Sequence, residues 1–187
     1  QVALVHGPNG AGKTSLLRVC AGLLPLTDGT AEVLGHDLRA DRRSVRRSVG
    51  LLGHATFLYD DLTVAEQIAF AARAAHRPAF DAAAAAARLG VDGRLAGVQV
   101  GRLSAGQRRR VALACLLARG AELWLLDEPH AGLDAAGRDL IDELIAERAA
   151  AGGTVVLASH ELDRARAIAG AVFAIGGGVV REDARVA

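Results

Sequence analysis

One lysine stands among the 22 Lys and Arg residues of this chain, and it lies in a segment with the spacing of a phosphate-binding loop. The segment reads Gly7-Pro8-Asn9-Gly10-Ala11-Gly12-Lys13-Thr14 and fits G-x-x-x-x-G-K-[ST] at every fixed position. Lysine supplies a compact, flexible point charge, which the rigid planar fork of arginine replaces poorly. Because the β- and γ-phosphates of a nucleotide need such a charge, we expect Lys13 to bind phosphate.

The residues around Lys13 have the other properties that a phosphate site needs. Glycines let the backbone turn tightly and direct its N–H groups at phosphate, and a helix that begins at Lys13 adds its positive end. Thr14 offers a hydroxyl to Mg²⁺, and Ser15 offers a second one nearby. The predicted nucleotide-binding residues of this loop are Gly7, Pro8, Asn9, Gly10, Ala11, Gly12, Lys13, Thr14 and Ser15. The alternative is a glycine-rich turn that matches the pattern by accident.

A second candidate is a pair of carboxylates at the end of an apolar strand, Leu123–Asp127. A buried strand that carries an acid at its C-terminal edge delivers it beside the phosphate loop of a neighbouring strand. We therefore expect Asp127 to hold Mg²⁺, directly or through water, and Glu128 to polarise an attacking water molecule. The alternative is an ordinary strand end with exposed acids.

A third segment, Leu103–Gln107, precedes a helix that carries Arg108, Arg109 and Arg110. Taken alone, Ser104 is a helix N-cap before a basic first turn. Basic side chains near a helix N-terminus are mildly unfavourable, which indicates an anionic partner for them.

The order and spacing of these segments resemble the ATP-binding subunits of ABC transporters. Leu103-Ser104-Ala105-Gly106-Gln107 is similar to their signature motif, and Ala131-Gly132-Leu133-Asp134 is similar to their D-loop. His160, at the end of a predicted strand, resembles their switch histidine. The motifs run in order from Gly7 to His160, so the resemblance covers nearly the whole chain.

The resemblance implies an activity, cofactors and partners. Two copies would pair head to tail as a homodimer, with each ATP between the phosphate loop of one copy and the signature of the other. The signature and D-loop residues implied at the nucleotide are Ser104, Gly106, Gln107 and Asp134. Glu128 would act on the water and His160 would sense the γ-phosphate, both as catalytic residues. ATP and Mg²⁺ are the implied cofactors, and hydrolysis would drive a separate transmembrane permease.

The chain departs from the family pattern at two places. The family has a glutamine at the start of the loop that leads to its helical insertion, where this chain has Ala55, preceded by His54. His54 could reach Mg²⁺ or the water, and a surface histidine is the alternative. The family also stacks adenine on an aromatic residue near its N-terminus, and Tyr59 and Trp124 are badly placed for that role. We expect residues 56–59 to line the groove that receives the permease.

Within the family, four segments together resemble the haem-exporter ATP-binding subunits of bacterial cytochrome c maturation. They are Gly53-His54, Tyr59–Thr63, Ser104–Gln107 and Trp124–Pro129. This resemblance implies a peripheral subunit on the cytoplasmic face of the bacterial inner membrane. Open alternatives are the ATPase of another small-molecule, drug or lipid exporter, an ABC-type ATPase that acts on translation or DNA, and a nucleotide-binding regulatory module.

The elements that must position these residues are strands alternating with helices, which predicts an α/β fold with a mostly parallel sheet. The resemblance makes this fold a P-loop NTPase of the ABC ATPase type. The expected strands are Val2–Val5, Thr30–Leu34, Val49–Leu52, Leu123–Asp127, Thr154–Ser159 and Val172–Ile175. The expected helices are Lys13–Leu24, Val64–Ala75, Phe80–Leu89, Gly106–Arg119, Ala135–Ala151 and Glu161–Ile168. Residues 1–54 and 120–187 are the predicted core subdomain, residues 55–119 are the helical one, and Gly176-Gly177-Gly178 is a predicted hairpin turn.

Composition limits the function classes. A length of 187 residues suits one domain, and a net charge of +1 argues against a nucleic-acid partner. No apolar run reaches the length of a membrane span. Cys20 and Cys115 lie in apolar helical stretches and are expected to be buried free thiols. The chain has no methionine and opens in the middle of a strand, so we expect that a natural N-terminal segment is missing.

Overall fold

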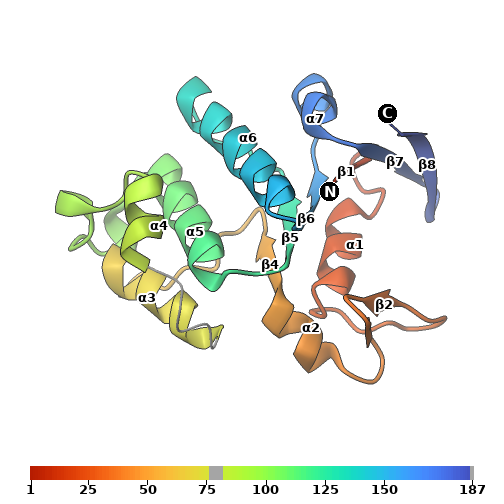
Figure 1. Ribbon diagram of the computed structural model, residues 1–187, viewed down its shortest axis with the longest axis horizontal. Coiled ribbons are helices and arrows are strands. Elements are labelled where there is room, and N and C mark those ends of the chain that lie inside the picture. Colours follow the sequence, from red (N-terminus) through yellow and green to blue (C-terminus); the bar gives the residue numbers. More distant parts are fainter. Residues whose placement is uncertain (76–81, 186–187) are drawn as a thin grey trace. The chain divides into compact units, whose positions relative to one another are not determined.

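The computed structural model of the protein describes residues 1–75 and 82–185, and its chain divides into two compact units. One, which we call the core unit, comprises Gln1–His54, Glu122–Ala131 and Ala135–Ala187. The other, the helical unit, comprises Ala55–Ala121 and Gly132–Asp134. Figure 1 shows the strands of the core unit and the helices of the helical unit.

The core unit is built on a six-stranded sheet with the order β4-β5-β6-β1-β7-β8. Its strands are β1 (Val2–His6), β4 (Val49–Leu52), β5 (Leu123–Asp127), β6 (Thr154–Ala158), β7 (Ala171–Gly176) and β8 (Val179–Arg185). All neighbouring pairs are parallel except β7 and β8, which form an antiparallel hairpin. The predicted α/β fold with a mostly parallel sheet is therefore confirmed. In such a sheet the loops after the parallel strands gather at one edge, where ligands bind.

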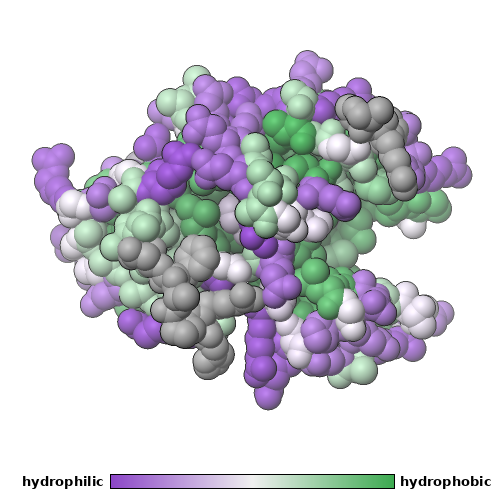
Figure 2. Space-filling view, viewed as in Figure 1, coloured by the Kyte–Doolittle hydropathy of each residue, from purple (hydrophilic) through white to green (hydrophobic). Residues whose placement is uncertain are grey.

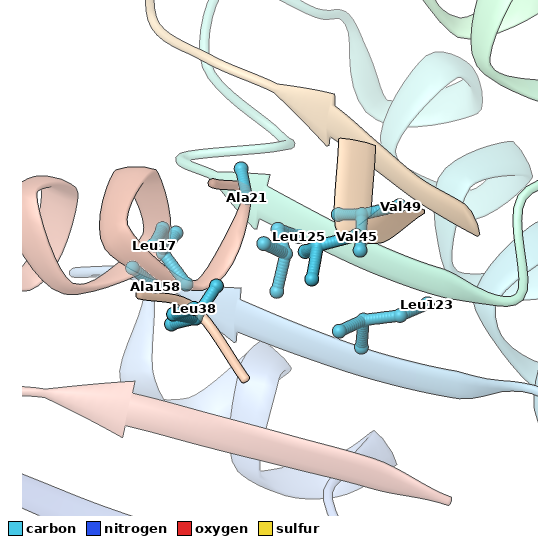
Figure 3. Close-up of a cluster of buried hydrophobic side chains, with 8 residues drawn as sticks. All are labelled: Leu17, Ala21, Leu38, Val45, Val49, Leu123, Leu125 and Ala158. Carbon is cyan, nitrogen blue, oxygen red and sulfur yellow. The ribbon is translucent and has the colours of Figure 1, made fainter. Parts of the chain in front are cut away.

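One face of this sheet is covered by α1 (Lys13–Cys20) and α2 (Arg42–Ser48), which bury a shared apolar cluster (Figure 3). The buried members of the cluster are Leu17, Ala21, Leu38, Val45, Val49, Leu123, Leu125 and Ala158. Leu17 is 1% exposed, and truncating such a leucine to alanine costs about 2–5 kcal/mol of stability. This packing fixes α1, and with it the loop before α1, on the sheet.

The other face of the sheet is apolar as well. Side chains alternate along a strand, and Trp124 and Leu126 of β5 are as buried as their neighbours on the first face. In the core unit, α6 (Ala135–Ala150) packs on β6 and α7 (Leu162–Ile168) packs on β1. A sheet buried on both faces explains why its strands read as continuous apolar runs.

Most of the predicted core elements are confirmed within one or two residues. Strands β4 and β5 have the expected bounds, while β1, β6 and β7 shift slightly at their ends. The predicted glycine turn is the two-residue loop of the β7–β8 hairpin, with Gly177 at φ 57° and Gly178 at φ 78°. Positive φ at both positions matches the right-handed twist of the flanking strands. The expected strand list had missed β8.

The predicted strand Thr30–Leu34 is confirmed only in its middle, and it lies outside the main sheet. Only β2 (Glu32–Val33) forms, and it pairs antiparallel with β3 (His36–Asp37) in a separate two-stranded sheet. Leu34 and Gly35, with φ of 52° and 77°, make the tight turn between them. The apolar residues of this segment are typical of a strand of the main sheet. Val33 instead packs against the apolar cluster under α1 and does not join the six-stranded sheet.

The end of α1 and the presence of α2 differ from the expected helices. Helix α1 ends at Cys20 rather than Leu24, because Gly22 has φ 67° and the Leu23 N–H donates to the Arg18 carbonyl at 2.9 Å, as in a Schellman cap. Helix α2 was not expected, since Val45 is its only buried residue and arginines mask its periodicity. Its N-cap is Asp41, whose carboxylate accepts from the Ser44 N–H at 3.0 Å.

The helical unit contains α3 (Val64–Ala74), α4 (Ala82–Arg88) and α5 (Ala105–Arg119), which pack on one another, and two short 3₁₀ turns, Gly93–Leu95 and Val100–Arg102. The predicted helices here are confirmed where the structure describes them; the start of the expected helix Phe80–Leu89 lies outside the described residues.

Figure 2 shows hydrophilic residues over much of one face of the molecule, with smaller apolar patches between them. In the described part of the chain, none of the helices has the length and apolar character to cross a membrane.

The two cysteines are free thiols, as expected. Cys115 of α5 is buried, and this burial raises the pKa of its thiol to about 12. Cys20 is only partly buried, which corrects the prediction for this residue, because α1 ends there and the chain turns away. Burial also raises the pKa of the Cys20 thiol.

Candidate active site

The loop between β1 and α1 surrounds the ammonium group of Lys13. The Lys13 ammonium donates to the carbonyl oxygens of Gly7 at 2.7 Å and Pro8 at 3.1 Å. Gly7 has φ 154°, and a Cβ built there would lie 2.1 Å from the carbonyl oxygen of Ile175 on β7. The loop therefore needs glycine at this position, and its curvature holds the lysine charge in place.

The N-terminus of α1 opens directly into this loop. Its N-cap is Gly12, at φ 102°, and no side chain caps it in the described structure. The first N–H groups of a helix have no partner within the helix, and here glycine leaves them to the loop. They form a concave donor site with a positive end, which is suited to phosphate oxygens.

Thr14 and Asp127 meet at the edge of the sheet. Thr14 Oγ1 donates to Asp127 Oδ2 at 2.8 Å, and Asp127 is 5% exposed. The expectation that the strand of Asp127 neighbours the strand of the loop is wrong, because β6 lies between β5 and β1. Helix α1 packs on both β5 and β6, and this crossing carries Thr14 to Asp127.

The oxygen pair of Thr14 and Asp127 fits Mg²⁺. This ion prefers oxygen ligands and is held by one or two protein groups together with phosphates and waters. Among the described residues there is no group of three or more His, Cys, Asp or Glu that could hold a metal ion. A cation shared between these two side chains and a nucleotide phosphate matches this donor set.

Glu128 and His160 lie next to one another beyond the ends of β5 and β6. His160 Nδ1 is 2.8 Å from Glu128 Oε2, and the His160 N–H donates to the same oxygen at 3.3 Å. This contact follows from the β5–β6 register, in which Asp127 pairs with Ala158, because Glu128 and His160 come one and two residues after that pair. Glu128 has φ 50°, and its N–H donates to the Ala158 carbonyl at 2.8 Å. A non-glycine residue in this conformation is held by its surroundings, which is common at functional sites.

The signature-like segment begins α5 in the helical unit. Ser104 Oγ accepts from the Gln107 N–H at 3.2 Å, and Gln107 Oε1 accepts from the Ser104 N–H at 2.9 Å. This capping box confirms Ser104 as an N-cap. A Cβ built at Gly106 would lie 3.6 Å from the carbonyl oxygen of Gly132, so the signature-like and D-loop-like segments touch.

Arg108 and Arg110 have acidic partners within the helical unit. Arg108 forms an ion pair with Asp60 at 2.6 Å, and Arg110 lies 3.5 Å from Asp134. The anionic partner that the basic turn indicated is thus supplied by the chain itself. Asp134, an expected nucleotide-site residue, is held by Arg110 in this structure.

The segment after β4 presents aromatic side chains to solvent. Phe57 is 67% exposed with φ 50°, and Tyr59 is 57% exposed. The Tyr59 ring meets Phe70 of α3 edge to face, with 5.5 Å between centroids. His54 and Ala55, at the position of the expected glutamine, are also exposed.

His130, which is not one of the predicted site residues, is 1% exposed and lies two residues after Glu128. Its Nε2 is 2.8 Å from Asp142 Oδ1 on α6. His130 follows a proline and belongs to no sequence motif, so nothing in the sequence indicates that its side chain is buried. The burial follows from the packing of α6.

The chain is similar in sequence to known proteins. Residues 1–131 match the family model described as ABC transporter. The chain is 46% identical over 159 residues to the cytochrome c biogenesis ATP-binding export protein CcmA 2 of Cupriavidus metallidurans, covering 84% of this chain and 75% of that protein. It is 44% identical over 159 residues to a protein of the same description, CcmA, from Paramagnetospirillum magneticum, covering 82% and 72%.

The fold is also similar to solved structures. The ATP-binding cassette MJ0796, described as a bacterial ABC transporter cassette and solved as a dimer, superposes with a TM-score of 0.88 at 25% identity, covering 98% of this chain and 84% of that one. A second structure of MJ0796, a dimeric post-hydrolysis state bound to ADP and Pi, gives a TM-score of 0.86 at 24% identity over the same shares of the two chains.

Proposed function

Because this chain belongs to the ABC transporter family, as an ATP-binding subunit that hydrolyses ATP, we propose that it drives the export of haem for cytochrome c maturation. The observation that carries the proposal is the 46% identity to CcmA 2, whose description is a cytochrome c biogenesis ATP-binding export protein. The runner-up is the ATPase of another small-molecule, drug or lipid exporter.

In the proposed mechanism the phosphate loop binds ATP. Lys13 exchanges its bonds to loop carbonyls for the β- and γ-phosphates, and the N–H groups at the start of α1 surround the same phosphates. Thr14, through its hydroxyl oxygen, and Asp127, through its carboxylate, would hold Mg²⁺, and the ion would supply positive charge beside the phosphates.

Glu128 and His160 carry the hydrolytic step. Glu128 is 20% exposed, so a water molecule can reach its carboxylate and donate a hydrogen bond to it. His160 fixes the orientation of that carboxylate, and its own side chain is 71% exposed, which makes it accessible to the γ-phosphate. The carboxylate thus orients and polarises the attacking water while the histidine senses the phosphate.

The proposed assembly is a homodimer bound to a permease. A second copy supplies Ser104, Gly106 and Gln107 at the start of its α5, where backbone N–H groups and the helix end attract the γ-phosphate. The exposed aromatics Phe57 and Tyr59 are the proposed contact with the permease, because such rings are enriched at protein interfaces. The subunit would then lie on the cytoplasmic face of the bacterial inner membrane.

The test is deletion of the gene in the source organism, followed by haem staining of membrane proteins. Loss of c-type cytochromes, restored by the wild-type gene and not by Glu128→Gln, supports haem export. Normal c-type cytochromes, together with new sensitivity to an exported compound, favour the runner-up.

A further inference from the structure

A chain of polar side chains in the core unit connects the segment after β5 to α6 and α7. It begins at His130, whose Nε2 is 2.8 Å from Asp142 Oδ1 on α6. Asp142 Oδ2 accepts from Arg164 Nη1 on α7, and Arg164 Nη2 donates to Asp139 Oδ1 at 3.0 Å. His130, Asp142 and Arg164 therefore link three segments that are separate in the sequence.

The two ends of this chain lie close in sequence to Glu128 and His160. His130 is two residues after Glu128, and Arg164 is four residues after His160. Since Glu128 and His160 touch at 2.8 Å, the contacts close into a ring. We call His130, Asp142 and Arg164 the positioning ring.

The chemistry of the ring fixes its geometry. An ionised carboxylate only accepts, so His130 must carry its proton on Nε2 to bond Asp142. Among the described residues, none forms a hydrogen bond with the buried His130 Nδ1, so Nε2 carries the bond that ties this imidazole to α6. Asp142 accepts on both oxygens, from His130 and from Arg164, and so cannot rotate without breaking one of the two bonds.

We infer that His130, Asp142 and Arg164 are positioning residues, which hold the backbone of Glu128 and that of His160 at the separation needed for hydrolysis. The inference rests on the roles proposed above for those two residues. Glu128 has a backbone conformation that a non-glycine residue rarely adopts, so it needs support from its surroundings. Its neighbour His130, locked in the interior at 1% exposure, supplies that support through α6, and Arg164 ties the same aspartate to the helix that follows His160.

The test compares His130→Phe with His130→Gln in purified protein. Phenylalanine fills the site but cannot donate to Asp142, whereas the terminal amide of glutamine places a donor near the position of Nε2. Ile145→Val is the matched control, because it removes one methylene from a residue of α6 that is 1% exposed and leaves the ring intact. Arg164→Gln is the second variant, since it opens the ring from its partly exposed end without disturbing the interior.

Two measurements are made on each variant. Steady-state kinetics give kcat and KM for ATP. Nuclear magnetic resonance of ¹⁵N-histidine-labelled protein follows the imidazole nitrogens of His160, which is one of six histidines. For His130→Phe and Arg164→Gln we expect kcat to fall about tenfold, because a small misplacement of a catalytic group costs at least that much. KM should stay within about twofold, since Lys13 and Thr14 are untouched. The imidazole signals of His160 should shift in His130→Phe and Arg164→Gln. They should keep their wild-type positions in His130→Gln and in Ile145→Val.

His160 signals that are unchanged in both His130→Phe and Arg164→Gln would overturn the inference. Signals that shift without a loss of kcat would show that the three residues position His160, and would overturn the need for that position in hydrolysis and with it the role proposed for His160. The two failures are thus distinguishable.

Discussion

Thr14 Oγ1 donates to Asp127 Oδ2 at 2.8 Å, although the strands that lead to these residues are separated by β6. Helix α1 makes this possible because it crosses from the end of β1 over β6 to β5. The contact brings a hydroxyl and a carboxylate oxygen together at the mouth of the phosphate loop. This is the arrangement that a cation shared with a nucleotide phosphate requires.

The first prediction concerns that oxygen pair. Asp127→Asn removes the negative charge and keeps the shape, so Mg²⁺ should no longer strengthen nucleotide binding. We expect a loss of about tenfold or more in affinity with Mg²⁺ present and little change with a chelator, since loss of a group that supports a metal site costs about 10–100-fold in metal affinity. Titration calorimetry with and without Mg²⁺ measures both. Equal sensitivity to Mg²⁺ in the two proteins would contradict the assignment.

Glu128→Gln should separate binding from hydrolysis. The variant keeps the phosphate loop and the Thr14–Asp127 pair, so ATP should bind with unchanged affinity. Turnover should fall about 10²-fold or more, because general-base catalysis contributes that much. A dimer that retains ATP should then be visible by size-exclusion chromatography. Turnover equal to that of the wild-type protein would remove Glu128 from the mechanism.

Gly7→Ala should damage the loop itself. The added Cβ would lie 2.1 Å from the Ile175 carbonyl oxygen, and backbone at φ 154° cannot relieve the clash. We expect nucleotide affinity to fall about tenfold or more, because an alanine forced into this conformation must displace the loop. Gly97→Ala is the control, since a Cβ there meets nothing within 4 Å. Similar affinities for the two variants would show that the close approach to β7 is not needed.

The capping box at the start of α3 predicts a pH dependence of stability. Hydrogen bonds from the Thr63 N–H and hydroxyl lower the pKa of Glu66 from its ordinary value. A carboxyl whose folded pKa is lowered stabilises the protein above its unfolded pKa and loses that contribution as the pH falls through the folded pKa. Thr63→Ala should therefore have a lower thermal midpoint than the wild-type protein at neutral pH. The difference in thermal midpoint between the two proteins should become smaller at pH values below the ordinary pKa of glutamate. A difference between the two proteins that stays constant with pH would contradict this account.

The phosphate loop and most of the helices were predictable from the sequence because the signals are local. Eight consecutive residues define the loop, and glycines at Gly7 and Gly12 permit its backbone whatever surrounds it. Ser104 is an N-cap through a contact with Gln107, three residues away. The apolar runs of β4 and β5 likewise match strands of a sheet that is buried on both faces.

The tertiary structure alone decided the contacts between distant residues. Local pattern does not encode strand order, so the sequence could not show that β6 separates β1 from β5, or that Thr14 nonetheless reaches Asp127. It placed Glu128 and His160 in one site only by resemblance, whereas the β5–β6 register brings them to 2.8 Å. The sequence determined which residues form the loop and the carboxylate pair, and the order and register of the strands decided which of them touch, because contacts across a sheet depend on every strand between them.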